Sequence, residues 1–172
     1  MNAKFNELLD RFYQASSSTK KNEIYDEMVE YADSYHDGYV CYDMAMYVAL
    51  YKYAKTSKQR KHALEHIQDI IIDDSYQFSD ELIENFKEFT HISEFLNEKD
   101  EEVFDALCMK VLNFFGNRKK ESEFEAFAEH YDIASEIPVW GSNAQLKEVA
   151  EIVVGANMHN ESYVIAQTIL GI

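Results

Sequence analysis

The sequence predicts an all-α protein: a single domain of about eight helices that spans residues 1–172 as an irregular bundle or a short HEAT-like stack. Apolar residues recur every three or four positions along most of the chain, which is the spacing of one helix face. Proline occurs once and glycine five times, which is too few for the many tight turns of a β-protein. Hydrophobic residues make up 47% of the 172 residues, enough to fill a core without disulfides or metals.

The N-terminal part of the chain predicts four helices. Residues 2–15 form the first, and the second is expected to stop near Gly38, which can adopt the positive φ of a helix C-terminus. Residues 39–55 are apolar nearly all round, so they predict a central buried helix. Thr56 or Ser57 is expected to cap the fourth helix. The expected core residues of that helix are Ala63, Leu64, Ile67, Ile70 and Ile71.

The C-terminal part predicts further helices with recognisable ends. Ser79 is a suitable N-cap, and the acids Asp80 and Glu81 after it are favoured by the positive end of the helix dipole. A strong apolar stripe over residues 103–115 is expected to end at Gly116. The helix that Ser79 caps is expected to bury apolar residues between Leu82 and Ile92. The remaining expected elements are helices at residues 124–131 and, capped by Ser142, 143–155, followed by a last helix or an edge strand at residues 163–172.

The formal net charge of −16 is concentrated in the middle of the chain. Residues 73–136 hold 18 acids and 6 bases, whereas residues 1–72 hold 11 acids and 9 bases. Nucleic-acid backbones and anionic membrane surfaces are therefore excluded as expected partners, and a basic protein is favoured. We expect a cytoplasmic protein without a signal peptide or membrane span, in which Cys41 and Cys108 are buried free thiols.

Two short patterns resemble metal-binding motifs. His62 and His66 belong to an H-x-x-E-H pattern that would place both rings on one helix face, but we expect an exposed polar face there. Glu88 and His91 form an E-x-x-H step of the kind found in di-iron bundles, and Asp33 to His36 is an imperfect second copy. The sequence predicts no catalytic residue, no cofactor and no metal, and a metal-binding helical-bundle enzyme is kept as an alternative.

The expected partner-binding residues are acidic, with two tyrosines beside them. Six carboxylates fall within twelve residues of the middle segment, where a basic partner would relieve their mutual repulsion. Tyrosine suits a surface that is half apolar and half wet, and it is enriched in interfaces. The candidates are Glu94, Glu98, Asp100, Glu101, Glu102 and Asp105, joined by Asp80, Glu81, Glu84, Tyr35 and Tyr39.

In size, in its charge of −16, in its lack of an enzyme motif and in its tyrosines beside acids, the chain resembles the acidic helical immunity proteins of bacterial contact-dependent and polymorphic toxin systems. That resemblance implies a one-to-one complex that covers the active cleft of a cationic nuclease toxin, or a neighbouring exosite, by occlusion. It carries no diagnostic motif, so it transfers no site residue. A nucleic-acid mimic and a helical-repeat scaffold that binds a peptide are the remaining alternatives.

Overall fold

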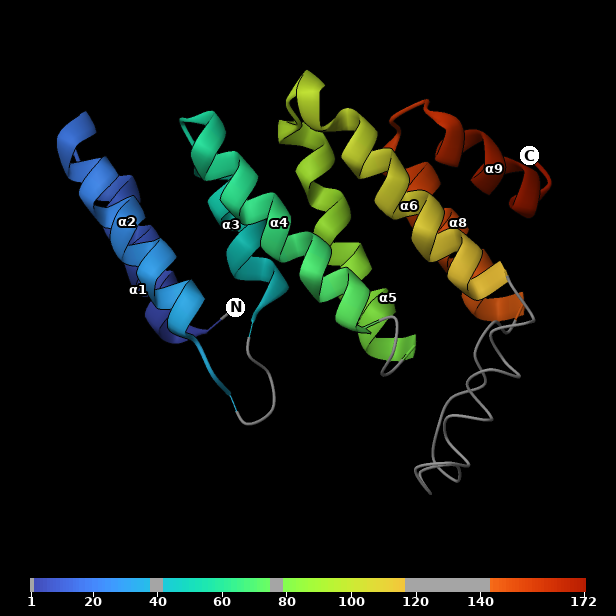
Figure 1. The fold of residues 1–172 in the computed structure, drawn as a ribbon, viewed down its shortest axis with the longest axis horizontal. Helices are drawn as coiled ribbons and strands as arrows, with labels where there is room; N and C mark the ends of the chain where they lie inside the picture. The colour runs from blue at the N-terminus through green and yellow to red at the C-terminus, as the bar shows by residue number, and fades with distance from the viewer. Residues whose placement is uncertain (1, 38–41, 75–78, 117–142) are drawn as a thin grey trace. The chain divides into compact units, whose positions relative to one another are not determined.

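The computed structural model describes residues 2–37, 42–74, 79–116 and 143–172. Every regular element in these ranges is a helix (Figure 1), so the all-α prediction is confirmed for them. The chain divides into two compact units, Met1–Ile70 and Ile71–Ile172, and each unit is described by itself. The expectation of a single domain stays a prediction. Within the described ranges, no helix combines the length and the apolar content that a membrane span requires.

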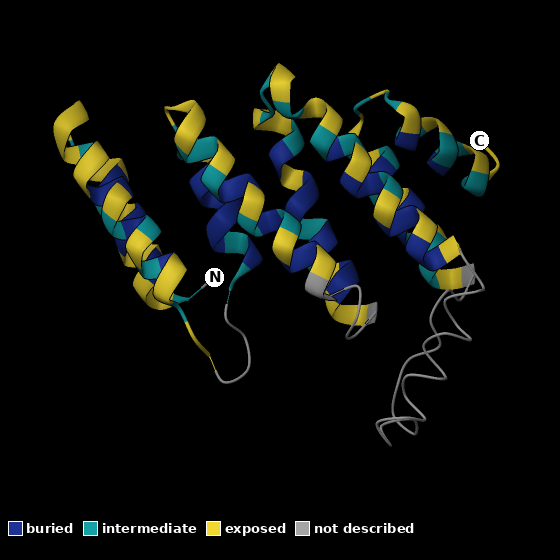
Figure 2. Ribbon diagram, in the orientation of Figure 1, coloured by how far each residue is buried: buried dark blue, intermediate teal, exposed yellow. Residues whose placement is uncertain are grey.

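Unit 1 contains α1 (Ala3–Gln14), α2 (Ser18–Ser34), α3 (Met44–Tyr53) and all but the end of α4 (Ser57–Asp74). α1 packs on α2, and α2 packs on α3. α1, α2 and α4 each bury residues on one face and expose residues on the opposite face (Figure 2), as an amphipathic helix at a surface must, whereas α3 is buried nearly all round. The rings of Tyr13 in α1 and Tyr53 in α3 lie edge to face, and their hydroxyls share a hydrogen bond.

The α1–α2 hairpin is held by apolar burial and by one ion pair. Phe5 and Met28 are fully buried between the two helices. The guanidinium of Arg11 donates two hydrogen bonds to the carboxylate of Glu27, at 2.8 and 3.2 Å. This bidentate pair fixes the register of the two helices at the edge of their contact.

Helix α3 is shorter than the sequence predicts, because Asp43 sets its start. The Asp43 carboxylate accepts a hydrogen bond from the backbone N–H of Met46, which makes Asp43 an N-cap. Residues 39–41 lie outside the described residues, while Tyr42 and Asp43 are not helical. The expected burial is confirmed, since seven of the ten residues of α3 are buried.

A reciprocal cap joins α3 to α4. The Thr56 hydroxyl accepts from the backbone N–H of Gln59 at 3.2 Å, and the Gln59 side chain accepts from the N–H of Thr56 at 3.1 Å. Thr56 is therefore the cap, and Ser57 is the first residue of α4. This fixes where α4 starts, and the register of its side chains follows from that start. All five expected core residues of α4 are buried.

Unit 2 contains α5 (Ser79–Thr90), two 3₁₀ turns η1 (His91–Phe95) and η2 (Glu98–Asp100), α6 (Glu101–Gly116), α8 (Asn143–Ala156) and α9 (Glu161–Leu170). α6 packs on both α8 and α9, α8 packs on α9, and α5 packs on α8. The C-terminal segment, expected to be a last helix or an edge strand, forms the helix α9, so the edge-strand alternative is wrong. Gly116 is the last residue of α6 instead of following it. The expected helix at 124–131 and the cap at Ser142 lie outside the described residues, as do Gly38 and Cys41.

The cores match the apolar periodicity. In unit 2, Phe86, Phe89, Phe104 and Phe115 have at most 1% of their surface exposed. Cys108 is fully buried, as expected for a structural thiol, and burial raises its pKa. Phe114, which is off the three-to-four-residue spacing of the stripe over residues 103–115, is also buried. Burial of such side chains stabilises each unit by about 1.5–3 kcal/mol per residue.

Acid is expected to loosen the α1–α2 hairpin through Glu27. The hydrogen bond and charge of Arg11 hold the pKa of Glu27 below its usual value of 4.5. Because the folded-state pKa is depressed, the pair stabilises the fold above the unfolded-state pKa, and this stability is lost as pH falls through the folded-state value. The melting temperature of Glu27→Gln should therefore lie below that of wild type at about pH 7, and the gap should be smaller at a low pH, below the folded-state pKa of Glu27.

The matched control is Glu23→Gln, which removes an exposed pair with Lys20 inside α2 and links no two helices. Its melting temperature should stay closer to wild type at neutral pH. An equal gap between Glu27→Gln and wild type at both pH values would contradict the assignment.

Candidate functional site

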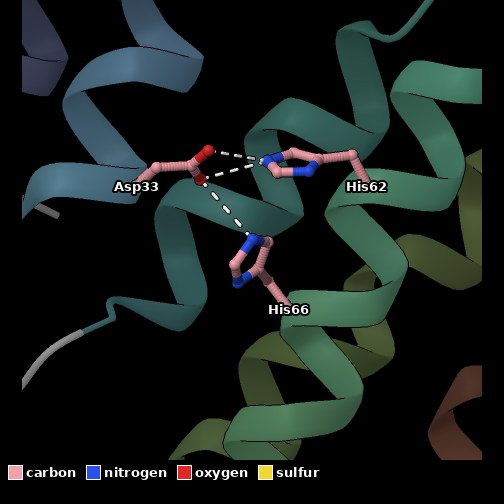
Figure 3. A group of neighbouring side chains, drawn as sticks. All are labelled: Asp33, His62 and His66. Atoms are coloured by element: carbon pink, nitrogen blue, oxygen red, sulfur yellow. Dashed lines mark hydrogen bonds and ion pairs between the residues drawn. The ribbon is translucent and has the colours of Figure 1, made fainter.

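Three side chains with metal-ligating chemistry converge in unit 1 (Figure 3). Asp33 projects from the last turn of α2, while His62 and His66 project from α4, one helical turn apart. Because residues i and i+4 share a helix face, the register of α4 brings both rings to the same side. We call Asp33, His62 and His66 the Asp–His cluster.

The ring nitrogens of the Asp–His cluster face one carboxylate. Nε2 of His62 lies 3.0 Å from each oxygen of Asp33, and Nε2 of His66 lies 3.6 Å from Oδ1. One ligand atom from each residue lies within 4.8 Å of the other two. The side chains of Asp33 and His62 are 35% and 34% exposed, and that of His66 is 19% exposed. The cluster is therefore partly open to solvent on the Asp33–His62 side.

Tyr47 of α3 contacts two members of the cluster, Asp33 and His66. Its buried hydroxyl donates a 2.8 Å hydrogen bond to Oδ1 of Asp33, and desolvation together with this bond raises the pKa of Tyr47. Its ring stacks on the His66 imidazole, with centroids 4.5 Å apart and planes 20° apart. The Tyr42 ring covers another side of His66 at 4.9 Å. Asp33 and His66 are thus held by residues that are themselves fixed by packing.

His66 is adapted to the neutral state. Burial lowers its pKa, against the opposing attraction of Asp33, so the imidazole is uncharged at neutral pH. Its Nδ1 atom is buried and has no hydrogen-bond partner among the described residues.

In the structure, the two histidines of the H-x-x-E-H pattern belong to a cluster that does not include the glutamate of the pattern. The expectation of an exposed polar face is wrong for His66, which is mostly covered by aromatic rings. Glu65, the base in a peptidase of this pattern, is exposed and lies 3.7 Å from Lys61, outside the cluster. The third member is Asp33, which sequence reasoning had grouped with His36. Proximity of α2 to α4 is a tertiary fact, and no sequence spacing indicated it.

The E-x-x-H pair in unit 2, Glu88 and His91, has no third metal-ligating side chain beside it among the described residues. His91 and Glu88 lie 3.8 Å apart, with side chains 67% and 39% exposed. Among the described residues, no other His, Cys, Asp or Glu completes this pair to a group of three. The two residues form a surface pair of the kind common on helices.

The expected partner-binding acids gather mainly at the start of α6. Glu94 lies in η1, Glu98 and Asp100 in η2, and Glu101 and Glu102 in the first turn of α6. We call these five residues the acidic junction. Asp100 is half-buried, and the other four are exposed. The described residues contain no ion pair to any of these four carboxylates.

Asp105 differs from its neighbours because it has an internal role. Its Oδ1 accepts a 2.9 Å hydrogen bond from the backbone N–H of Ser162, in the first turn of α9. Ser162 is fully buried, and Asn160 caps the next N–H group of the same turn. Asp105 therefore fastens α9 to α6.

The other candidates lie away from the acidic junction. Asp80 and Glu81 lie in the first turn of α5, whose 12 residues separate them from the junction by about 18 Å. Glu84 lies 3.1 Å from Lys87, which also reaches Glu148 of α8 at 2.9 Å. Tyr35 is half-buried and belongs to unit 1. Tyr39 lies outside the described residues.

Comparisons with protein-family models, with curated proteins and with solved structures found no match to the chain.

Substitution of Asp105 is expected to destabilise unit 2 more than loss of an acid from the junction. Asp105→Ala leaves the buried N–H of Ser162 without its acceptor, which should cost about 1–2 kcal/mol of unfolding free energy. Glu98→Ala removes an equal charge from an exposed site and should change stability by less than about 0.5 kcal/mol. Urea denaturation followed by circular dichroism measures both. Equal losses in the two variants would refute the internal role of Asp105.

Proposed function

We propose that the chain is an acidic binding protein that neutralises a basic partner through the acidic junction. The single observation that carries the proposal is the concentration of four exposed carboxylates, those of Glu94, Glu98, Glu101 and Glu102, to which the described residues offer no ion pair. In this stretch of nine residues Lys99 is the one cation against five acids. The resemblance to immunity proteins makes a cationic nuclease toxin the most concrete partner, blocked by occlusion.

Electrostatics favours such a partner for two reasons. Like charges held close on a surface repel each other, and a cationic surface removes this repulsion when it docks. Complementary fields also steer the encounter and raise association rates far above those of neutral pairs. Nucleic acid and anionic membranes carry the same sign as the junction, so neither is a partner in this proposal.

The mechanism requires no chemistry from this chain. Arginine and lysine side chains that grip a phosphate backbone in a nuclease cleft would form charge-assisted hydrogen bonds with Glu94, Glu98, Glu101 or Glu102 instead. Substrate would then be excluded by steric occlusion and by a negative potential over the cleft. We propose that this takes place in the cytoplasm, where a nuclease toxin finds its substrates.

The partner can be identified by affinity capture on the full chain at about 50 mM and about 500 mM salt. A partner held through the acidic junction should be retained at low salt and released or weakened at high salt. The purified partner is then tested for nuclease activity with and without one equivalent of the chain. A captured protein that is acidic, or a basic one whose activity does not change, would refute the proposal.

Neutralising the junction should slow association with that partner. The combined substitution Glu94→Gln, Glu98→Gln, Glu101→Gln and Glu102→Gln removes four charges while it keeps side-chain size. We expect the association rate constant to fall about tenfold or more at low salt and its salt dependence to weaken. Stopped-flow or surface-based kinetics measures both quantities. Asp105 is left intact, because it fastens α9.

The matched control removes the same number of charges from unit 1. Asp10, Asp26, Glu30 and Asp69 are exposed, and the described residues contain no ion pair to them. Their Asn or Gln variant has the same net charge as the junction variant, so it isolates position from total charge. Equal slowing in both variants would show that net charge alone steers the partner. Competition by DNA of any sequence for the same partner surface would instead indicate a nucleic-acid mimic.

A further inference from the structure

We propose that Asp33, His62 and His66 form a binding site for a divalent transition-metal ion, best suited to Zn²⁺, that links α2 to α4 within unit 1. This inference is independent of the proposed partner binding, which concerns unit 2. It rests on the convergence of the ligand atoms, on their chemical type and on the side chains that hold them in place (Figure 3).

The spacing of the ligand atoms fits a small tetrahedral ion. A tetrahedron with metal–ligand bonds of about 2.0–2.1 Å has edges of about 3.3–3.4 Å. The separations of the Asp33 carboxylate from the two Nε2 atoms are 3.0 Å for His62 and 3.6 Å for His66, on either side of that value. The ligand atoms of the cluster lie within 4.8 Å of one another, so small side-chain rotations complete the triangle.

The ligand set selects the class of ion. Two imidazole nitrogens and one carboxylate oxygen suit zinc, cobalt, nickel and iron, whereas Mg²⁺ and Ca²⁺ require mostly oxygen ligands. Three protein ligands leave at least one position for solvent. The partial exposure of Asp33 and His62 provides access for that water and for the entering ion.

The cluster is held before any ion arrives. The hydroxyl of Tyr47 orients the Asp33 carboxylate, and the ring of Tyr47 fixes the plane of His66. His62 and His66 lie one turn apart on a single helix, so their relative position is set by the backbone of α4. Such outer contacts typically strengthen metal binding by about 10–100-fold.

The surrounding charges do not prevent cation binding. The ammonium group of Lys61 lies 3.7 Å from the carboxylate of Glu65, which partly balances its charge. Lys58, one turn before His62, is exposed, so solvent screens its charge. Coordination through Nε2 requires the proton of a ring to lie on Nδ1, and it replaces the direct contacts between the rings and Asp33. For His66 that leaves a buried N–H without a partner among the described residues, which weakens the binding of the ion.

The test is isothermal titration of Zn²⁺ into the full, metal-free chain. Wild type should bind one equivalent at this site. Asp33→Asn and His66→Gln should each weaken this binding by about tenfold or more, and Tyr47→Phe should weaken it less. His91→Gln is the matched control, because it removes a histidine that also lies near a carboxylate but outside the cluster. Far-UV circular dichroism verifies that each variant is folded.

A second measurement separates this site from loose surface binding. An ion that bridges α2 and α4 should raise the melting temperature of wild type and of His91→Gln, but not that of Asp33→Asn. Co²⁺ should give the visible absorption of a tetrahedral centre with wild type. This absorption should be absent from Asp33→Asn and His66→Gln. Mg²⁺ should produce neither effect. The proposal is overturned if wild type binds no Zn²⁺ up to about 100 µM, or if the cluster variants bind like wild type.

Discussion

The burial of one apolar stripe per helix is the constraint on which the rest of the described structure depends. Isolated helices of 10 to 18 residues, the range found here, are marginal in water, so their stability comes from packing against neighbours. Phe5 and Met28 between α1 and α2, and Phe89 and Phe104 in unit 2, form such contacts. Polar side chains then decide where each helix starts and stops. Asp43, Thr56 and Asn160 each satisfy N–H groups that would otherwise lack acceptors.

Packing also creates the polar arrangements that could carry function. Asp33 lies at the end of α2, and it becomes a shared acceptor because α3 presents Tyr47 to it and α4 presents His62 and His66. None of these contacts is local in sequence. Asp105 is similar, since its bond to Ser162 spans 57 residues and exists because α6 packs on α9. Each of these carboxylates has an internal role that its position in an acidic sequence conceals.

This explains which parts could be predicted from the sequence. Helix periodicity depends on neighbours three or four positions apart, so the core residues of α4 and the acid-rich first turn of α5 are as expected. The start of α3 was misplaced because an apolar run hides the cap at Asp43. Prediction of the Asp–His cluster would have required the distance between α2 and α4. That distance depends on side-chain packing in three dimensions. Only His62 and His66, four residues apart on one helix, had a signal in the sequence. Asp33 had none.

The helix dipoles of the fold favour some carboxylates of the acidic junction and not others. Glu101 and Glu102 lie in the first turn of α6, where the positive end of the helix dipole favours them by about 0.3–1 kcal/mol each at an exposed site. Glu94 has no such benefit, because it follows the C-terminal end of α5, where a negative charge is disfavoured. Glu98 precedes α6 by three residues within a single 3₁₀ turn. The helix dipole therefore accounts for half of the exposed junction, and the proposed binding of a basic partner rests mainly on the negative charge of Glu94 and Glu98.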